Sequence, residues 1–246
     1  AAWKVAADLA LNLEPLEAKM AASSQAHDEA RHFYVMHDYL QLLNYSPNKL
    51  PPAANRILHE ILTANSMAKK ILGMHLMVEP IALTLFQLVR EHELEPVLSE
   101  LLVYYERDEA RHIALGVHYL PQLIEQMSHR EVVDFYLWQM RMFMIELDGV
   151  REMQSDFRAL GFSPAEVVRL GQLKQLHAGR LVAQQLGSTI PAEELLTRVI
   201  DFRLALSFPE DPDTPRLQRW RDAFKALALP PDETRILQEK LDKMKA

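Results

Sequence analysis

The sequence predicts an all-α fold on three observations. Leu, Ala, Met, Glu, Gln and Arg, which favour helices, dominate the 246 residues, and only seven glycines occur. Apolar residues recur at steps of three and four over long stretches of the chain, as they do on one face of a helix. Alternating strand patterns and glycine-rich phosphate loops are both absent from the sequence. A chain of this length is also long enough to enclose one large core.

The first half of the chain should contain three long helical stretches. The first covers residues 16–44, and the segment "NYSPNKLPPAAN" ends it. The second runs from about 56 to 90, with a kink or division near Pro80. After the turn at "EHELEP", the third runs from Pro96 to about residue 126. The expected inward stripes are Ala22, Ala26, Glu29, Phe33, Met36, Leu40 and Leu43 in the first helix, and Leu102, Tyr105, Glu109, His112, Gly116 and Leu120 in the third.

The second half should also be helical. Residues 128–160 are expected to form one methionine-rich helix, which begins with a capping box of Ser128 and Glu131. Ser163 and Glu166 predict a second capping box at the start of the next helix. Further helices are expected at 191–207, 215–227 and 231–245. We therefore divide the chain into a core at 1–126 and additional helices at 127–246, packed on the same domain.

Composition and charge exclude several classes of function. The net charge of −7 argues against general nucleic-acid binding, so no nucleic-acid partner is expected. Cysteine is absent, which excludes disulfides, thiolate nucleophiles and zinc–thiolate sites. The segment "AAWKVAADLALNLEP" lacks the basic lead-in and the apolar core of a secretory signal. We therefore expect a cytoplasmic protein.

One segment is long and apolar enough to resemble a membrane span. It is "ILGMHLMVEPIALTLFQLV", residues 71–89. His75 and Glu79 interrupt it, and no second segment of this kind accompanies it. We interpret it as a helix buried on all sides in a soluble bundle, with no membrane span.

The pentapeptide Asp-Glu-Ala-Arg-His occurs twice, at residues 28–32 and again eighty positions later at 108–112. On a helix, Glu and the His three residues later lie on one side, which pairs Glu29 with His32 and Glu109 with His112. Both pairs lie on the inward stripes, where ionisable groups are unfavourable unless they are paired or bind a cation. Helical bundles bury such pairs around two metal ions, with one further Glu from each of two other helices.

Glu79 is the candidate for one of these further carboxylates. It lies thirty residues before Glu109, a spacing that suits an antiparallel neighbour with its ligand at the same height. By the eighty-residue offset, its counterpart falls before Ala1, and we favour that position for the sixth ligand. The alternatives, which lie close to Glu29 in sequence, are Asp8, Glu14 and Glu17. In the other interpretation, Glu79-Pro80 only marks the start of a helix.

The doubled motif resembles the ferritin-like di-iron carboxylate superfamily, over roughly residues 1–125. The resemblance is closest to its oxygen-activating branch, the monooxygenase hydroxylases and the oxidases that look like ribonucleotide reductase small subunits. It implies a ferritin-like four-helix bundle with additional C-terminal helices, and two iron ions (or Fe/Mn, or Mn/Mn). The implied metal ligands are Glu29, His32, Glu79, Glu109 and His112. The resemblance further implies that Asp28 and Asp108 each hydrogen-bond a ligand histidine, which would fix its tautomer.

Four more residues are candidates for positions around the ligands. Arg31 and Arg111 could pair with these aspartates or with nearby carboxylates. His75 lies one turn before Glu79, and Tyr105 lies one turn before Glu109. His75 could be an extra ligand or a hydrogen-bond donor to a ligand, and Tyr105 could contact the site or donate an electron, but each could also simply belong to the core. If the motif occurred once, an exposed helical patch with an Asp–Arg pair would explain it, but two copies on inward stripes disfavour that interpretation.

The resemblance implies an oxidase or oxygenase that uses O₂ and possibly an electron-donor protein. Phe33, Met36 and Leu102 suggest apolar surroundings and hence a small hydrophobic organic substrate. A ribonucleotide reductase small subunit fits less well, because Met36 stands where that family places its radical tyrosine. The alternatives are a ferritin-like metal-binding or peroxide-scavenging protein and a metal-free scaffold. Long amphipathic helices also make a homodimer plausible.

Overall fold

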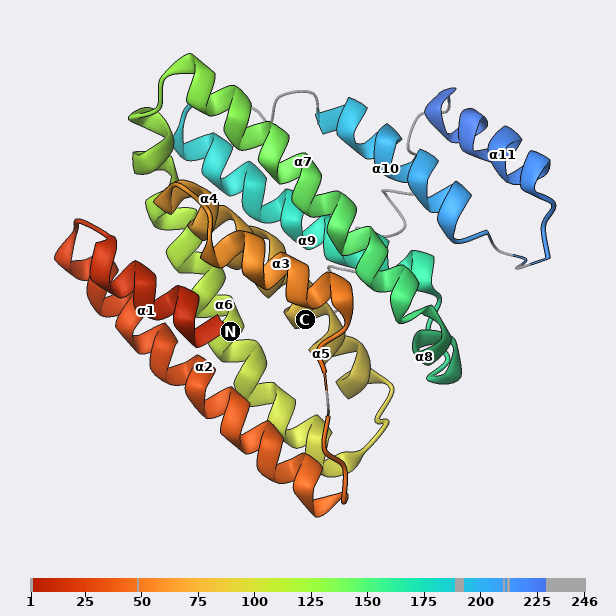
Figure 1. Cartoon of the computed structure of the whole chain (residues 1–246), viewed down its shortest axis with the longest axis horizontal. Coiled ribbons are helices and arrows are strands. Elements are labelled where there is room, and N and C mark those ends of the chain that lie inside the picture. The colour runs from red at the N-terminus through yellow and green to blue at the C-terminus, as the bar shows by residue number, and fades with distance from the viewer. Residues whose placement is uncertain (1, 48, 189–192, 210, 212, 229–246) are drawn as a thin grey trace.

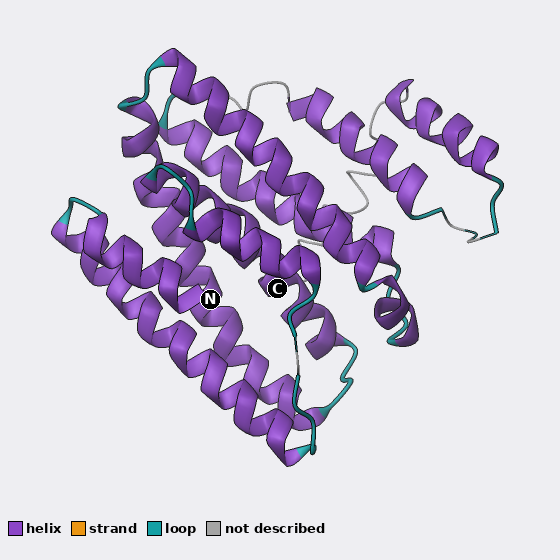
Figure 2. Cartoon of the chain, viewed as in Figure 1, coloured by secondary structure: helices purple, strands orange, loops and turns teal. Residues whose placement is uncertain are grey.

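The structure is a computed structural model that describes residues 2–47, 49–188, 193–209, 211 and 213–228 (Figure 1). In this part of the chain every regular element is a helix and no strand is present (Figure 2). The all-α prediction is confirmed for these residues, whereas the helix expected at 231–245 lies outside them. The helices are, in chain order, α1 (Ala2–Asn12), α2 (Leu16–Leu42), α3 (Pro52–Leu62), α4 (Met67–Ile71), η1 (Leu72–Val78), α5 (Glu79–Glu91), α6 (Pro96–Glu125), α7 (His129–Glu152), α8 (Gln154–Ala159), α9 (Pro164–Gln185), α10 (Glu193–Ser207) and α11 (Arg216–Ala228).

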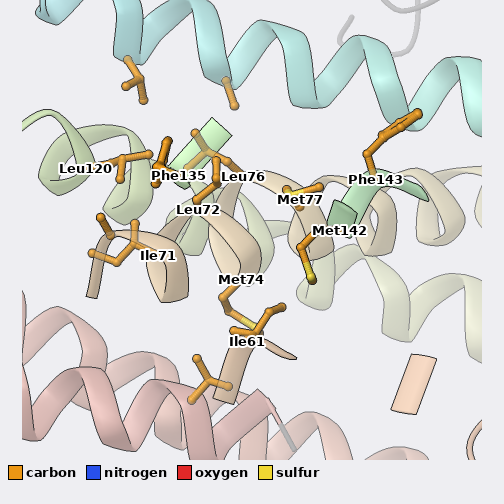
Figure 3. Close-up of a cluster of buried hydrophobic side chains, with 14 of the residues drawn as sticks. Ile61, Ile71, Leu72, Met74, Leu76, Met77, Leu120, Phe135, Met142 and Phe143 are labelled. Carbon is orange, nitrogen blue, oxygen red and sulfur yellow. The ribbon is translucent and has the colours of Figure 1, made fainter. Parts of the chain in front are cut away.

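The helices pack as a bundle that brings distant segments side by side (Figure 1). α1 packs along α2, while α6 packs against both α2 and α5. On the other side of the central run, α9 packs against α5 and α6, α7 packs against α3, and α10 and α11 form a hairpin at one end of the view. One cluster of buried apolar side chains extends from Val5 in α1, through Leu72 and Met77 in η1, to Leu204 in α10 (Figure 3). Residues on both sides of position 126 therefore share this core.

The central run consists of α4, η1 and α5, which are continuous from Met67 to Glu91. We predicted a kink or division near Pro80. The run is continuous there but changes from a π-helix to an α-helix at Glu79, and the interruption between helices lies earlier, between Leu62 and Met67. The Oγ of Ser66 caps the new helix by accepting a hydrogen bond from the backbone N–H of Lys69 at 3.3 Å. Pro80 is the second residue of α5, just after the π-helical η1, and a proline in the first turn of a helix costs no intrahelical hydrogen bond.

By length and composition alone, the central run could cross a membrane, since its most apolar window has a mean hydropathy of 1.5. Most of that window is buried by neighbouring helices, with Ile71, Met74 and Met77 almost completely enclosed. Core helices of soluble proteins have the same length and composition. The run is therefore only weak evidence for a membrane span.

Two glycines allow η1 to approach its neighbours closely. A Cβ on Gly116 of α6 would lie 2.4 Å from the Cβ of His75, and one on Gly73 would lie 2.7 Å from Cγ1 of Ile61. Both distances are shorter than real Cβ contacts. Glycine at these two positions therefore brings η1 against α6 and α3, and this contact sets the height of Glu79 in the bundle.

The ends of the C-terminal helices agree with the sequence in part. The capping box of Ser128 and Glu131 is present, as predicted. The helix expected at 128–160 is interrupted, because α7 ends at Glu152 and the short α8 follows. Ser163 precedes α9 but makes no side-chain capping hydrogen bond, so the second capping box is wrong.

The inward stripe of α2 also differs from the prediction. Its buried side chains include Gln25, Asp28, Glu29 and His32, whereas Phe33 is 57% exposed. The ring of Phe33 lies 5.2 Å from that of Trp3, so α1 covers it only partly. We did not predict α1, and its packing along α2 turns the ionisable residues of α2 toward α6.

Candidate metal centre

Four ionisable side chains meet between α2, α5 and α6. Glu29 comes from α2, Glu79 from the first residue of α5, and Glu109 and His112 from α6. One ligand atom of each lies within 4.8 Å of the others, and all four residues are buried. A buried group of this composition could hold a metal ion, because oxygen and imidazole nitrogen atoms converge where water is largely excluded.

His112 occupies the middle of this group. Its Nδ1 lies 3.2 Å from Oε2 of Glu109, 3.5 Å from Oε2 of Glu79 and 3.6 Å from Oε1 of Glu29. Burial by itself would lower the pKa of this imidazole, but the hydrogen bond and charge of Glu109 and the charge of Glu29 outweigh it and raise the pKa. The three carboxylates around His112 therefore favour a positive charge at this place.

His32 lies on the other side of Glu109. Its Nδ1 is 3.5 Å from Oε1 of Glu109, while Oε2 of the same carboxylate faces His112. Glu109 therefore offers one oxygen to each histidine. His32 does not belong to the group of four, but both histidines point the same nitrogen, Nδ1, at carboxylate oxygens.

The second nitrogen of each histidine faces the aspartate of the other motif copy. Nε2 of His32 lies 2.8 Å from Oδ2 of Asp108, and Nε2 of His112 lies 3.5 Å from Oδ2 of Asp28. An aspartate in this position holds the proton on Nε2 and leaves the lone pair of Nδ1 free to bind a cation. The first contact is a short hydrogen bond and the second is at the limit of one.

Arg31 and Arg111 join the two aspartates into a closed ring. Nη2 of Arg31 donates to Oδ1 of Asp28 at 2.9 Å and to Oδ2 of Asp108 at 2.6 Å. Nη2 of Arg111 donates to Oδ1 of Asp108 at 2.5 Å and to Oδ2 of Asp28 at 3.1 Å. Burial would raise the pKa of Asp108, but the hydrogen bonds from His32 and Arg111 lower it overall. The Asp/Arg ring, made of these four residues, therefore keeps Asp108 ionised behind His32.

Glu29 is the residue of the group whose carboxylate most clearly lacks a partner. Its Oε1 is buried without a hydrogen-bond partner among the described residues. Burial, assisted by the charge of Glu109 and opposed by that of His112, raises the pKa of Glu29 to about 7. A cation beside this oxygen would satisfy it and favour the ionised form. The residues present therefore fit a metal ion.

A hydrogen-bonded chain behind Glu79 contains one residue that the sequence did not reveal. Nε2 of Gln25 donates to Oε1 of Glu79 at 3.0 Å, and Oε1 of Gln25 lies 2.8 Å from Nε2 of His75. His75 is completely buried, and this burial lowers its pKa to about 3, so the ring is neutral and donates to Gln25. The only signal for Gln25 was its position one turn before Glu29, on the same helical face.

Tyr105 supports His32 from the other side. The two rings stack with centroids 4.0 Å apart, and the Tyr105 hydroxyl donates to the backbone oxygen of His32 at 3.0 Å. Burial raises the pKa of this phenol to about 12. Tyr105 therefore remains neutral, and it holds His32 in place through the stacked ring and the hydrogen bond to the backbone.

The in-chain alternatives for a sixth ligand lie elsewhere. Asp8 pairs with Lys70, whose Nζ lies 2.5 Å from its Oδ2. Glu14 and Glu17 are exposed at the start of α2 and the turn before it. Among the described residues, none of these three reaches the group of Glu29, Glu79, Glu109 and His112.

No protein-family model, curated protein or solved structure matches the chain. Its function must therefore be inferred from the site itself.

Proposed function

We propose that this chain is a ferritin-like dimetal carboxylate protein and that it acts as an O₂-dependent oxidase or oxygenase on a small hydrophobic molecule. The observation that carries the proposal is the arrangement of both histidines, each with Nδ1 toward the buried carboxylates and Nε2 toward an aspartate. Such outer partners are typical of metal-bound histidines. A buried network of ion pairs would not require His32 and His112 to have the same orientation on two different helices.

Two metal ions, rather than one, are supported by the position of Glu109. One of its oxygens faces His32 and the other faces His112, so this carboxylate could serve two cations. His112 with Glu29 and Glu79 would hold one ion, and His32 would hold the other. Iron, manganese or one of each fits this set, because oxygen and imidazole ligands accept both metals.

The protein itself would orient the metal ligands and exclude water from the site. When bound, the metal ions would supply the reduction of O₂ and the oxidation of the substrate. The Asp/Arg ring fixes both imidazole tautomers, and the chain from His75 through Gln25 holds one oxygen of Glu79. The burial of all five proposed ligands keeps the site dry, which strengthens every charge interaction within it.

The proposal of a hydrophobic substrate depends on apolar side chains around the site. Of the three apolar residues predicted around the site, Leu102 is buried, Met36 is half-buried and Phe33 is largely exposed. An electron-donor protein would have to deliver electrons from outside, because the site is enclosed. We also propose a cytoplasmic location, because the sequence contains no cysteine and therefore none of the disulfides that are common in secreted proteins.

The decisive experiment measures metal content and reactivity on one preparation. Protein from cells supplied with iron and manganese is analysed for metal per chain, then loaded anaerobically with Fe²⁺ and exposed to O₂ in an absorption spectrometer. About two metals per chain and a transient absorption band are expected for an O₂-reactive dimetal site. Slow, substrate-independent accumulation of ferric mineral would favour iron storage instead. No metal under any loading condition would refute the proposal and favour the metal-free scaffold.

A further inference from the structure

A second candidate site lies on the opposite side of the central run from the metal centre. It is a cavity of about 440 Å³ between η1, α7, α9 and α10, in the size range of small-molecule sites. Figure 3 shows Leu72, Met77, Phe135 and Phe143 along the side of η1 that faces α9. Apolar side chains from these four helices, with Ile124 of α6, make up most of its wall.

The cavity is distinct from the space around the metal ligands. Met77 lines it and Glu79 does not, although only one residue separates them. Two positions on a helix differ by about 200° in direction, so their side chains point to opposite faces. None of the five proposed ligands lines the cavity.

One end of the cavity is polar. Nε2 of Gln175 donates to the backbone oxygen of Met77 and to Oε2 of Glu146, both at 3.0 Å. These two hydrogen bonds use both amide hydrogens and leave the oxygen of Gln175 as the group open to a ligand. Gln172, one turn earlier, is only 8% exposed, and no hydrogen bond joins its carboxamide to another described residue. Its amide atoms are not among the buried atoms without a partner, so they are accessible, and Gln172 lines the cavity, where a ligand with a polar head could hydrogen-bond to them.

The described wall of the cavity carries no charge. It includes glutamines and a serine, but no Asp, Glu, Lys, Arg or His. Glu146 lies behind Gln175, and its burial raises its pKa to about 8, so it is protonated at neutral pH. A charged ligand would lose its hydration here without gaining a counter-charge, which is strongly unfavourable.

We propose that this cavity binds an uncharged molecule with an apolar body and one hydrogen-bonding head group, of the class of medium-chain alcohols. The head lies at Gln172 and Gln175, where it donates to the free amide oxygen. The body extends along α9 toward Val182 and Ala183, between Phe135 and Ile200. This proposal does not depend on the metal centre.

The test titrates 1-octanol into the full-length, chelator-treated protein in a calorimeter, with octanoate and octylammonium as charged competitors of equal length. Saturable 1:1 binding of octanol with a negative heat-capacity change is expected, and about tenfold or more weaker binding of both ions. Preferential binding of either ion would overturn the uncharged head group. Absence of saturable octanol binding would overturn the site.

Two variants locate the ligand. Ala183→Phe fills the cavity from α9 and should abolish octanol binding, whereas Ala159→Phe, on an exposed position of α8, is the matched control. Gln172→Leu should weaken octanol binding by about tenfold, the typical effect of one lost hydrogen bond. If Ala183→Phe reduces the helix content, Ala183→Met is used instead. Unchanged octanol affinity in folded Ala183 variants would refute the location.

The result is separable from that of the proposed function. Metal-free protein is used throughout, so octanol binding can succeed when metal loading fails. Conversely, a metal-loaded protein that binds no octanol would leave the metal centre intact and refute only the cavity.

Discussion

The two faces of the central run bury carboxylates in different ways. Toward α2 and α6, Glu29, Glu79 and Glu109 share one space with His112. Toward α9, Glu146 lies alone, with one oxygen bonded to Gln175 and the other without a partner among the described residues. Burial raises the pKa of Glu29 to about 7 and that of Glu146 to about 8. A raised pKa therefore does not identify a metal ligand. Convergence of several donors with outer hydrogen-bond partners does.

The largest expected effect is on metal content, which variants on the α2/α6 face should abolish and a variant on the α9 face should not change. Glu109→Ala and His112→Ala should each abolish dimetal binding, because they remove the shared carboxylate and the central imidazole. Glu146→Gln should leave the metal content unchanged. Elemental analysis measures metal per chain, and far-ultraviolet circular dichroism checks that helix content is retained. Two metals per chain in either of the first two variants would refute the assignment of the site.

The next effect concerns the outer partners of the histidines. Asp108→Asn should lower metal affinity by about 10- to 100-fold, the usual range for such a partner. Asp28→Asn should have a smaller effect, since its contact with His112 is 3.5 Å long, against 2.8 Å for Asp108 and His32. Competition with a chromophoric chelator gives both affinities. Equal losses would mean that the Asp/Arg ring acts as one unit and that the difference in distance has no consequence.

A third prediction tests the close contact that positions the central run. Gly116→Ala should lower the free energy of unfolding by about 1–3 kcal/mol, because the added methyl group would overlap His75. Gly149→Ala is the matched control, since its new methyl group would meet its nearest neighbour at 3.4 Å. Urea denaturation of both variants measures the difference. Equal stability would show that η1 moves aside without cost.

The last effect is a pH dependence of stability that comes from the buried Glu146. The pKa of Glu146 rises from 4.5 to about 8 on burial, so the folded state holds a proton that the unfolded state releases. Its contribution to stability is complete below pH 4.5 and is lost as the pH rises to 8, by at most about 1.4 kcal/mol per pH unit. Glu146→Gln should flatten the stability profile between pH 6 and 8.

The control for this prediction is Glu125→Gln on an exposed position, which should keep the wild-type slope. Denaturation midpoints at pH 6 and pH 8 in chelated protein are sufficient. A wild-type slope in Glu146→Gln would mean that another group holds the proton.

Periodicity and the repeat predicted much of the first face. Helical spacing alone turns Glu29, Glu109 and His112 inward, and the structure brings them together with Glu79. The partnership of Gln25 with Glu79 could not be predicted, because a single amide has no spacing signal and its partner lies 54 residues away. The exposure of Phe33 was missed for a similar reason, since helical spacing places it in the inward stripe but does not say which neighbouring helix covers it.

The second face was harder to predict from sequence. The cavity depends on how α7, α9 and α10 sit around η1, which is a matter of tertiary packing. The break before Met67 contains no proline or glycine, and only Ser66 signals the start of the new helix. Glu146 lies in a long helix with many polar residues, where nothing in the sequence distinguishes a buried carboxylate from exposed ones.

The Asp/Arg ring has a consequence for how such a chain can arise. Each aspartate serves the histidine of the other motif copy, and each arginine binds both aspartates. One copy alone keeps the pair between its own aspartate and arginine but lacks the aspartate that faces its histidine. Two identical segments, each carrying one motif copy and paired about a twofold axis, would complete the same ring across their interface. The ring is therefore one that a symmetric dimer of such segments could form before they were joined in a single polypeptide, and the two copies differ at the equivalent positions Gln25 and Tyr105.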